Sequence, residues 1–265
     1  MQPARRSLVP LVPLVAVLAA SAACKYDWPL PVADAGAPAA DAMADSPADA
    51  PTVDGDTRFS CTGATFCDAF DDGPLTPHWD DIFTGTAPGG TVRAEAVTST
   101  TSPPNALLAL RTADAVTSSA AYITKVIDVP FTHATLSFKV RPEIFDPTNA
   151  KACVAGIVFN DNADAHFVRI LAGNGKASLQ EKAGPINAYP LVSAPPLKTW
   201  STMTLSIDVP GDIVVRMDGV VMLQRAADPS WTKSTSTRIV LGINFVDTAG
   251  SGFAFHFDDV RFDGS

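Results

Sequence analysis

The residues of this sequence that could perform acid–base chemistry are few and far apart. Of the 28 acidic residues only Glu95, Glu143 and Glu181 are glutamates, and each stands alone in the sequence. A retaining glycosidase needs two carboxyl groups about 5 Å apart on converging side chains. No G-x-S-x-G motif is present, and the four histidines have no serine or cysteine partner at a recognisable spacing. We therefore expect no enzymatic activity.

A second set of residues has the chemistry of a ligand-binding loop. One tryptophan lies in a turn-like loop and one tyrosine in a proline-flanked loop, where an aromatic ring could stack on a sugar. A polar loop supplies amide and carboxylate groups that can bond to sugar hydroxyls. Asx-rich turns also form without any ligand, so a structural role remains the alternative. The candidate ligand-binding residues are Trp231, Tyr189, Asn160, Asp161, Asn162 and Asp164.

The four cysteines point to a local crosslink and not to a metal centre. Cys61 and Cys67 lie six residues apart across a glycine-containing turn, which in an exported protein predicts a disulfide. Cys153 lies in an apolar stretch, where a buried free thiol is expected. No C-x-x-C or H-x-x-x-H spacing occurs, so a zinc site is not indicated.

The elements that must position these residues are β-strands. Residues 202–209 alternate polar and apolar side chains, as expected for a strand with one wet and one dry face, and Pro210-Gly211 stops the pattern. No segment has a helical period. The sequence therefore predicts an all-β fold, a two-sheet antiparallel β-sandwich or jelly roll. Further strand candidates are residues 91–97, 106–111, 120–129, 134–141, 152–160, 165–171, 177–182, 213–217, 220–225, 238–246 and 253–262.

Two details of register can be predicted from the sequence. Asp218-Gly219 is a two-residue hairpin signal, because both central residues of a type I′ turn need positive φ. It should place Met217 opposite Val220, and Val215 opposite Met222.

The apolar pattern of the last strand changes phase along its length. Phe253, Phe255 and Phe257 share one parity, whereas Val260 and Phe262 have the other. We therefore predict a β-bulge at Asp258-Asp259.

Short phrases at both ends of the domain carry a family resemblance. F-D-D-G begins at Phe70 with Trp79 shortly after, F-D-D-V begins at Phe257, and W-x-x-x-x-L-x-I-D begins at Trp200. Together they resemble concanavalin A-like jelly rolls of the laminin G-like and glucanase-like type, over roughly residues 66 to 264. The resemblance implies that Trp79 and Trp200 are core tryptophans. It also makes the lack of the E-x-x-D-x-x-E phrase of laminarinase-type hydrolases evidence against glycoside hydrolysis.

The same resemblance suggests a calcium site. In jelly rolls the first and last strands can be neighbours, which would bring Asp71 and Asp72 close to Asp258 and Asp259. Carboxylate and carbonyl oxygens are the ligands that Ca²⁺ prefers. The alternative is that these aspartates cap strand ends and turns.

The N-terminus predicts export. Residues 1–23 carry two arginines, a short apolar run and small residues, as in a secretory signal, and the run is shorter than a membrane span of roughly 20 residues. The end of this segment resembles a bacterial lipoprotein signal, which implies lipidation of Cys24 and, with Lys25, sorting to an outer membrane. Ordinary cleavage after Ala22 is the alternative and would leave a soluble periplasmic or secreted protein.

Composition separates a tether from a folded domain. Residues 24–57 hold one lysine and seven aspartates among alanine and proline, so we expect a disordered linker before a domain at 58–265. The net charge is −9 and no basic cluster occurs, which argues against nucleic acid as a partner. Contact with a membrane is expected only through the lipid anchor.

These observations favour a cell-envelope lipoprotein whose β-sandwich binds carbohydrate without cleaving it. The alternative from another class is a structural or protein-adhesion module, whose partner would be an envelope protein. Glycoside hydrolysis is the minor alternative.

Overall fold

The computed structural model of the protein describes residues 59–85, 89–97, 103–113, 119–161, 164–182, 184–231, 234–248 and 250–265. The chain divides between Val53 and Asp54, and the described residues all belong to the second part. The predicted signal peptide (1–23), the lipidation site Cys24 and the linker (24–57) lie outside the described residues. Within the described ranges, no helix is long and apolar enough to cross a membrane.

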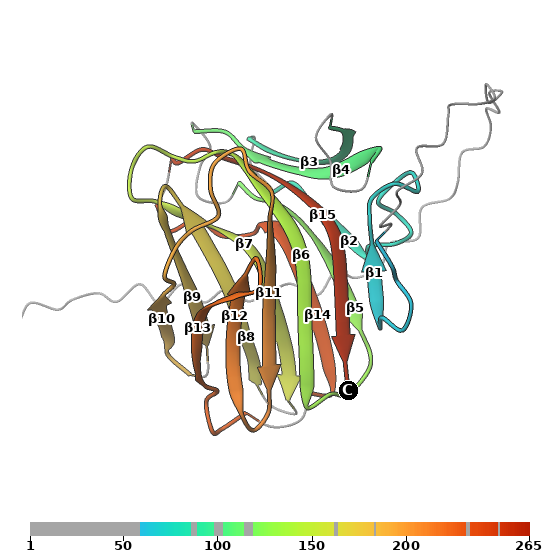
Figure 1. Ribbon diagram of the computed structural model, residues 1–265, viewed down its shortest axis with the longest axis vertical. Helices are drawn as coiled ribbons and strands as arrows, with labels where there is room; N and C mark the ends of the chain where they lie inside the picture. Colours follow the sequence, from blue (N-terminus) through green and yellow to red (C-terminus); the bar gives the residue numbers. More distant parts are fainter. Residues whose placement is uncertain are drawn as a thin grey trace, which may run out of the picture. The chain divides into compact units, whose positions relative to one another are not determined.

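The described residues form two antiparallel sheets (Figure 1). The first sheet has the order β13-β12-β11-β6-β15-β4-β3, with β1 also paired to β15, and the second has the order β10-β9-β8-β7-β14-β5-β2. The first sheet contains β1 (Phe66–Asp68), β3 (Gly90–Ala96), β4 (Asn105–Arg111), β6 (His133–Ile144), β11 (Ser201–Asp208), β12 (Asp212–Met217), β13 (Val220–Ala226) and β15 (Phe253–Gly264). The second contains β2 (Asp81–Phe83), β5 (Ala121–Ile127), β7 (Lys151–Asp161), β8 (Asp164–Gly173), β9 (Lys176–Lys182), β10 (Ile186–Pro190) and β14 (Ser236–Ile243). The predicted all-β sandwich is confirmed.

The core lies between the two sheets and follows from the period of two along each strand. In β6 the inward side chains are Leu136, Phe138 and Val140, and all three are fully buried. The second sheet supplies apolar side chains such as Ile239 and Leu241, which are equally buried. Polar side chains at the intervening positions of β6 and β11 face outward, so the alternation predicted for residues 202–209 is confirmed.

The predicted hairpin between β12 and β13 is present, with one difference in register. Asp218 and Gly219 both have positive φ, at 51° and 80°, and Met217 pairs with Val220 as predicted. The second predicted pair is wrong, because the register shifts between Val215 and Arg216 and Val215 faces Leu223 instead of Met222. The apolar pattern of the sequence does not reveal the extra residue of this β-bulge.

The predicted bulge in β15 is confirmed. The pairing of β15 with β6 shifts register between Asp258 and Arg261, and Asp259 has a φ of 48°. Phe257 before the bulge and Val260 after it are both fully buried, although their parity differs. The bulge therefore keeps the apolar side chains of the last strand on the core side along its whole length.

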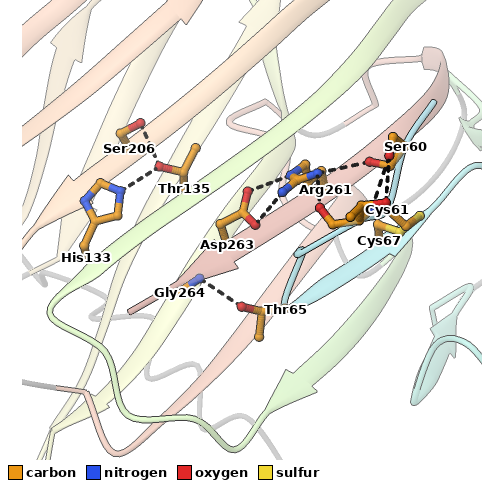
Figure 2. A network of polar contacts seen from close by, with 11 residues as sticks. Ser60, Cys61, Thr65, Cys67, His133, Thr135, Ser206, Arg261, Asp263 and Gly264 are labelled. Atoms are coloured by element: carbon orange, nitrogen blue, oxygen red, sulfur yellow. Dashed lines mark hydrogen bonds and ion pairs between the residues drawn. A yellow bond between two sulfur atoms is a disulfide. The ribbon is translucent and has the colours of Figure 1, made fainter. Parts of the chain in front are cut away.

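The start of the domain is fastened to the end of β15 (Figure 2). We call this contact the terminal clasp; it comprises residues 60–67 and residues 261–264. Cys61 and Cys67 form the predicted disulfide. The guanidinium of Arg261 donates to the carbonyl oxygen of Ser60 at 3.0 Å, and the backbone N–H of Gly264 donates to Thr65 at 3.1 Å.

The other cysteine of the described region behaves as predicted. Cys153 is buried and unpaired. Burial raises the pKa of its thiol to about 12. It is therefore an apolar side chain of the sheet and not a reactive thiol at neutral pH.

The core position of Phe257 leads to a first prediction. Phe257→Ala should lower the free energy of unfolding by about 3–5 kcal/mol, since it removes a fully buried ring from the strand that joins β4, β6 and β1. Urea denaturation followed by tryptophan fluorescence measures this. Val220→Ala, at a side chain that is 61% exposed, is the control and should change stability by less than about 0.5 kcal/mol. A loss below about 1 kcal/mol for Phe257→Ala would contradict the assignment.

The disulfide leads to a second prediction. Replacing both Cys61 and Cys67 by serine should cost about 2 kcal/mol, as expected from the chain entropy of so short a loop. A reducing agent added to the unsubstituted protein should produce a similar loss, and the double variant should not respond to it. If reduction leaves the denaturation midpoint unchanged, the disulfide does not contribute to stability.

Candidate functional site

The outer side of the first sheet carries a continuous set of polar side chains across neighbouring strands. We call this set the polar face. Thr204 on β11 pairs with Ser137 on β6 and with Arg216 on β12, so the three residues lie side by side on the outer surface. The polar face consists of Thr135, Ser137, Lys139, Arg141, Thr202, Thr204, Ser206, Arg216 and His256. Except for the buried His256, these residues are half-buried, as expected for an open sheet surface.

Hydroxyl groups on this face lie within hydrogen-bonding distance of one another. Thr135 and Ser206 lie opposite each other on β6 and β11, and their hydroxyl oxygens are 3.1 Å apart (Figure 2). The Thr135 hydroxyl also lies 3.2 Å from Nε2 of His133, whose Nδ1 is 2.5 Å from a carboxylate oxygen of Asp208. The face therefore presents donors and acceptors that are already oriented by one another.

The sheet brings together two glutamates that stand apart in the sequence. His256 on β15 lies between Glu143 on β6 and Glu95 on β3. Its Nδ1 is 2.9 Å from Glu143 Oε1, and its Nε2 is 2.7 Å from Glu95 Oε1. Arg93 donates to Glu95 at 2.9 Å, and Arg141 pairs with Glu143. We call Glu95, Glu143 and His256 the Glu-His-Glu group.

The charges of this group follow from its hydrogen bonds. Burial raises the pKa of Glu95, but hydrogen bonds from His256 and Arg93 outweigh it and leave that pKa lowered. Burial also raises the pKa of Glu143, but hydrogen bonds from Arg141 and His256 outweigh this effect, so the pKa of Glu143 is lowered as well. Ionised carboxylates can only accept hydrogen bonds, and His256 lies between the two of them. The group is a charged network without a carboxylic acid.

The positions of two tryptophans differ in a way that the family resemblance did not anticipate. Trp79 is 1% exposed, and its Nε1 donates to Asp68 at 2.7 Å, so the predicted core position is confirmed. The core position implied for Trp200 is wrong: this residue is half-buried, and its ring packs against the guanidinium of Arg141, 5.7 Å from the ring centroid. Trp200 directly precedes β11, and its contact with Arg141 places the ring at one end of the polar face.

The predicted stacking residues lie elsewhere and are engaged by the protein itself. Trp231 is 4% exposed and packs on Phe159 and His166, with ring centroids 5.0 and 5.8 Å away. So little exposed surface leaves no ring face on which a sugar could stack. Tyr189, on β10, covers the guanidinium of Arg225 at 3.9 Å.

An ion pair joins the two sheets beside Tyr189. Glu181 on β9 is 1% exposed, accepts from the backbone N–H of Asp228 at 3.2 Å, and pairs with Arg225 on β13. A buried carboxylate needs such partners because its desolvation is costly. Tyr189 and Glu181 therefore belong to a structural contact at the edge of the sandwich.

The predicted polar loop joins β7 to β8. Asp161 and Asp164 lie opposite each other in the register of this hairpin. Asn162 lies outside the described residues, as do the side chains of Asn160, Asp161 and Asp164. The ligand-binding role of this loop stays a prediction.

The four aspartates of the predicted calcium site lie near the first and last strands, which are neighbours as expected. Asp71 accepts from the backbone N–H of Asn105 at 3.0 Å, and burial, with nearby carboxylates, raises its pKa. Asp259 pairs with Lys139 at 2.8 Å, and the fully buried Asp258 accepts from the N–H of Asp259. Asp72 is exposed. Among the described residues no group of three or more potential ligands is arranged to hold a metal ion, and calcium binding stays a prediction.

Comparisons with known proteins identify the fold. No protein-family model matches the sequence, and no curated protein is significantly similar to it. Among solved structures, the cellulose-induced protein Cip1 matches with a TM-score of 0.53 and 14% identity, over 74% of this chain and 96% of that one. A carbohydrate esterase from the Shiga toxin-encoding bacteriophage phi24B matches with a TM-score of 0.52 and 10% identity, over 76% and 98%. Alginate lyase A1-II′, of polysaccharide lyase family 7, matches with a TM-score of 0.50 and 12% identity, over 65% and 83%. These similarities confirm the jelly-roll β-sandwich fold.

The lowered pKa values predict how stability depends on pH. A carboxyl whose pKa is lowered by folding stabilises the protein above its unfolded value, and this contribution is lost as the pH falls through the folded value. Below pH 4.5, the ordinary glutamate pKa, the protein should therefore lose stability faster than a Glu95→Gln/Glu143→Gln variant. Melting temperatures between neutral and acidic pH measure the difference.

The control for this experiment is Asp128→Asn, at an exposed position outside the group. It should follow the pH dependence of the unsubstituted protein. If the difference in melting temperature between the protein and the double glutamine variant stays constant as the pH falls, the two carboxylates are not held in their ionised form.

Proposed function

We propose that this domain binds a glycan on the polar face of its first sheet and does not cleave it. The observation that carries the proposal is the combination of hydroxyl, ammonium and guanidinium groups on one open sheet surface with a half-buried tryptophan, Trp200, at its end. Sugars are recognised by this pairing, since their hydroxyls need oriented hydrogen-bond partners and their C–H faces pack on aromatic rings.

The electrostatics of the Glu-His-Glu group support binding over hydrolysis. Glycoside hydrolysis by two carboxyl groups requires one of them to be a proton donor with a raised pKa. Both Glu95 and Glu143 have lowered pKa values. His256 is buried between them, so neither of its nitrogens is available to a substrate.

The comparisons add support of a weaker kind. The names of similar structures refer to carbohydrates: one is induced by cellulose, one is a carbohydrate esterase and one is an alginate lyase. A shared fold at this level of identity does not transfer an activity. The argument for glycan binding therefore depends on the residues of the polar face.

A protein-adhesion module is the second candidate. Along β13, at the edge of the first sheet, Val220 and Val221 are 61% and 44% exposed. Val192 is 81% exposed, and its N–H donates to the carbonyl oxygen of Met222 on the same strand. Exposed apolar side chains beside an edge strand favour contact with another protein.

The cellular setting is proposed from the sequence alone. We propose export of the protein, lipidation of Cys24 and display from an outer membrane on the linker 24–57. Calcium binding by the aspartates of the first and last strands is proposed on the same basis. A calcium-dependent rise in melting temperature would test it, because a ligand selective for the native state stabilises that state.

Glycan binding gives a direct test. The protein should bind at least one oligosaccharide on a glycan array, and Trp200→Ala and Arg216→Ala should each weaken that binding by about tenfold or more in calorimetry, about 1.4 kcal/mol. Arg238→Ala is the matched control, because Arg238 is a half-buried arginine on the second sheet. It should leave affinity unchanged.

Either of two results would overturn this proposal. Binding that survives both substitutions on the polar face would place the site elsewhere. If no oligosaccharide binds, and substitution of Val220 and Val221 by serine abolishes binding to an envelope protein, the adhesion module is the better description.

A further inference from the structure

Most of the cationic side chains described on the outer side of the first sheet are paired with carboxylates of the same sheet. Lys139 pairs with Asp259 at 2.8 Å, and Arg141 pairs with Glu143. His256 lies between two glutamates. Arg93 pairs with Glu95 at 2.8 Å, and Arg261 pairs with Asp263 at 2.7 Å. The imidazole of His133 lies 2.5 Å from a carboxylate oxygen of Asp208.

This pairing extends across the sheet. Arg93 and Glu95 come from β3, Arg261 and Asp263 from β15, and the other partners from β6, β11 and β15. Among the polar-face residues as described, Arg216 is the one cationic side chain for which no ion pair is seen. The face therefore has many charges but little net field.

Pairing of this kind decides what the face can bind. At each paired cation, a carboxylate or sulfate on a ligand would have to displace the protein carboxylate, and that displaced carboxylate would lose its hydrogen bonds. The lowered pKa values of Glu95 and Glu143 keep both carboxylates charged at neutral pH, so protonation does not release their partners. The chain as a whole, at a net charge of −9, also repels polyanions.

Hydroxyl groups face no such barrier. A sugar hydroxyl can accept from a paired guanidinium or ammonium and donate to the carboxylate beside it, without breaking the pair.

One end of the face is also apolar. The backbone N–H of Lys198 donates to the carbonyl oxygen of Pro142 at 2.7 Å, which holds the chain segment before Trp200 against the end of β6. Leu197, which directly precedes Lys198, is 50% exposed, and Ile144, two residues after Pro142, is 52% exposed.

We infer that the ligand of the polar face is a neutral glycan, and that uronate-containing and sulfated glycans are excluded by the ion pairing of the face. This inference rests on the proposed glycan-binding function and specifies the class of sugar.

The first experiment compares matched oligosaccharides. Calorimetry with neutral cello-, xylo- and arabino-oligosaccharides and with oligogalacturonate and alginate oligosaccharides of equal length should show binding only in the neutral set. The affinity should change by less than about twofold between about 50 mM and 500 mM salt, because no net charge is neutralised on binding.

The outcomes separate this inference from the function on which it rests. Tight, salt-sensitive binding of the acidic oligosaccharides, with weaker binding of the neutral set, would overturn the neutral-glycan assignment and leave glycan binding intact. Absence of binding by either set would overturn glycan binding itself, and the assignment with it.

The second experiment unpairs individual cations. Glu143→Gln removes the carboxylate that pairs with Arg141, and Asp259→Asn independently removes the carboxylate that pairs with Lys139. Each variant should gain about tenfold in affinity for acidic oligosaccharides, and that gain should disappear at high salt. Asp80→Asn is the matched control, since it releases Lys125 of the second sheet, away from the polar face.

The control should gain no affinity. If both polar-face variants fold, as judged by their melting curves, and neither gains affinity for acidic sugars, ion pairing does not determine the selectivity of the face.

Discussion

The structure depends on one constraint in the last strand. β15 must keep its apolar side chains in the core although the strand paired to one of its edges changes from β4 to β1. Residues 253–257 pair with β4, and residues 260–262 pair with β1. An uninterrupted period of two would turn either the first three phenylalanines or Val260 and Phe262 toward solvent. The bulge at Asp258-Asp259 removes this conflict. Asp259 takes the positive φ that the bulge requires, which aspartate tolerates better than most residues.

The same bulge determines the outer surface. Before it, the side chain of His256 faces outward and is hydrogen-bonded to Glu143 of β6 and Glu95 of β3. At it, Asp259 lies against Lys139, so the strand that completes the core also supplies the charges that balance the face. The terminal clasp then holds the far end of β15 through Arg261. The twelve residues of β15 therefore contribute to the core, to the charge balance of the outer surface and to the terminal clasp.

The tryptophans show why a binding site is hard to assign from residue type. Trp231 follows a turn and looks available, yet its ring completes an aromatic cluster with Phe159 and His166. Trp200 directly precedes β11 and resembles a core tryptophan, yet its ring packs against Arg141 on the outer surface. Burial of a large aromatic ring is favourable wherever the fold has space for it. The position of a residue in a loop does not show whether that space exists.

The sequence by itself determined the local features of this protein. Alternation along residues 202–209, the Asp218-Gly219 turn, the phase change of the last strand and the disulfide each depend on neighbouring residues, and each is confirmed. The sequence did not predict the strands β1, β2 and β10. Segments of three to five residues are too short to show a hydrophobic period.

Only the tertiary structure decided the candidate site. Glu95 and His256 are 161 residues apart, and Glu143 and His256 are 113 residues apart, so no spacing in the sequence records their contact. The order of strands in the first sheet places them together, and that order is set by which apolar faces pack best, a property of the whole chain. Local periods are encoded residue by residue, whereas the contact of His256 with Glu95 and Glu143 exists only once β6, β15, β4 and β3 lie in this order in one sheet.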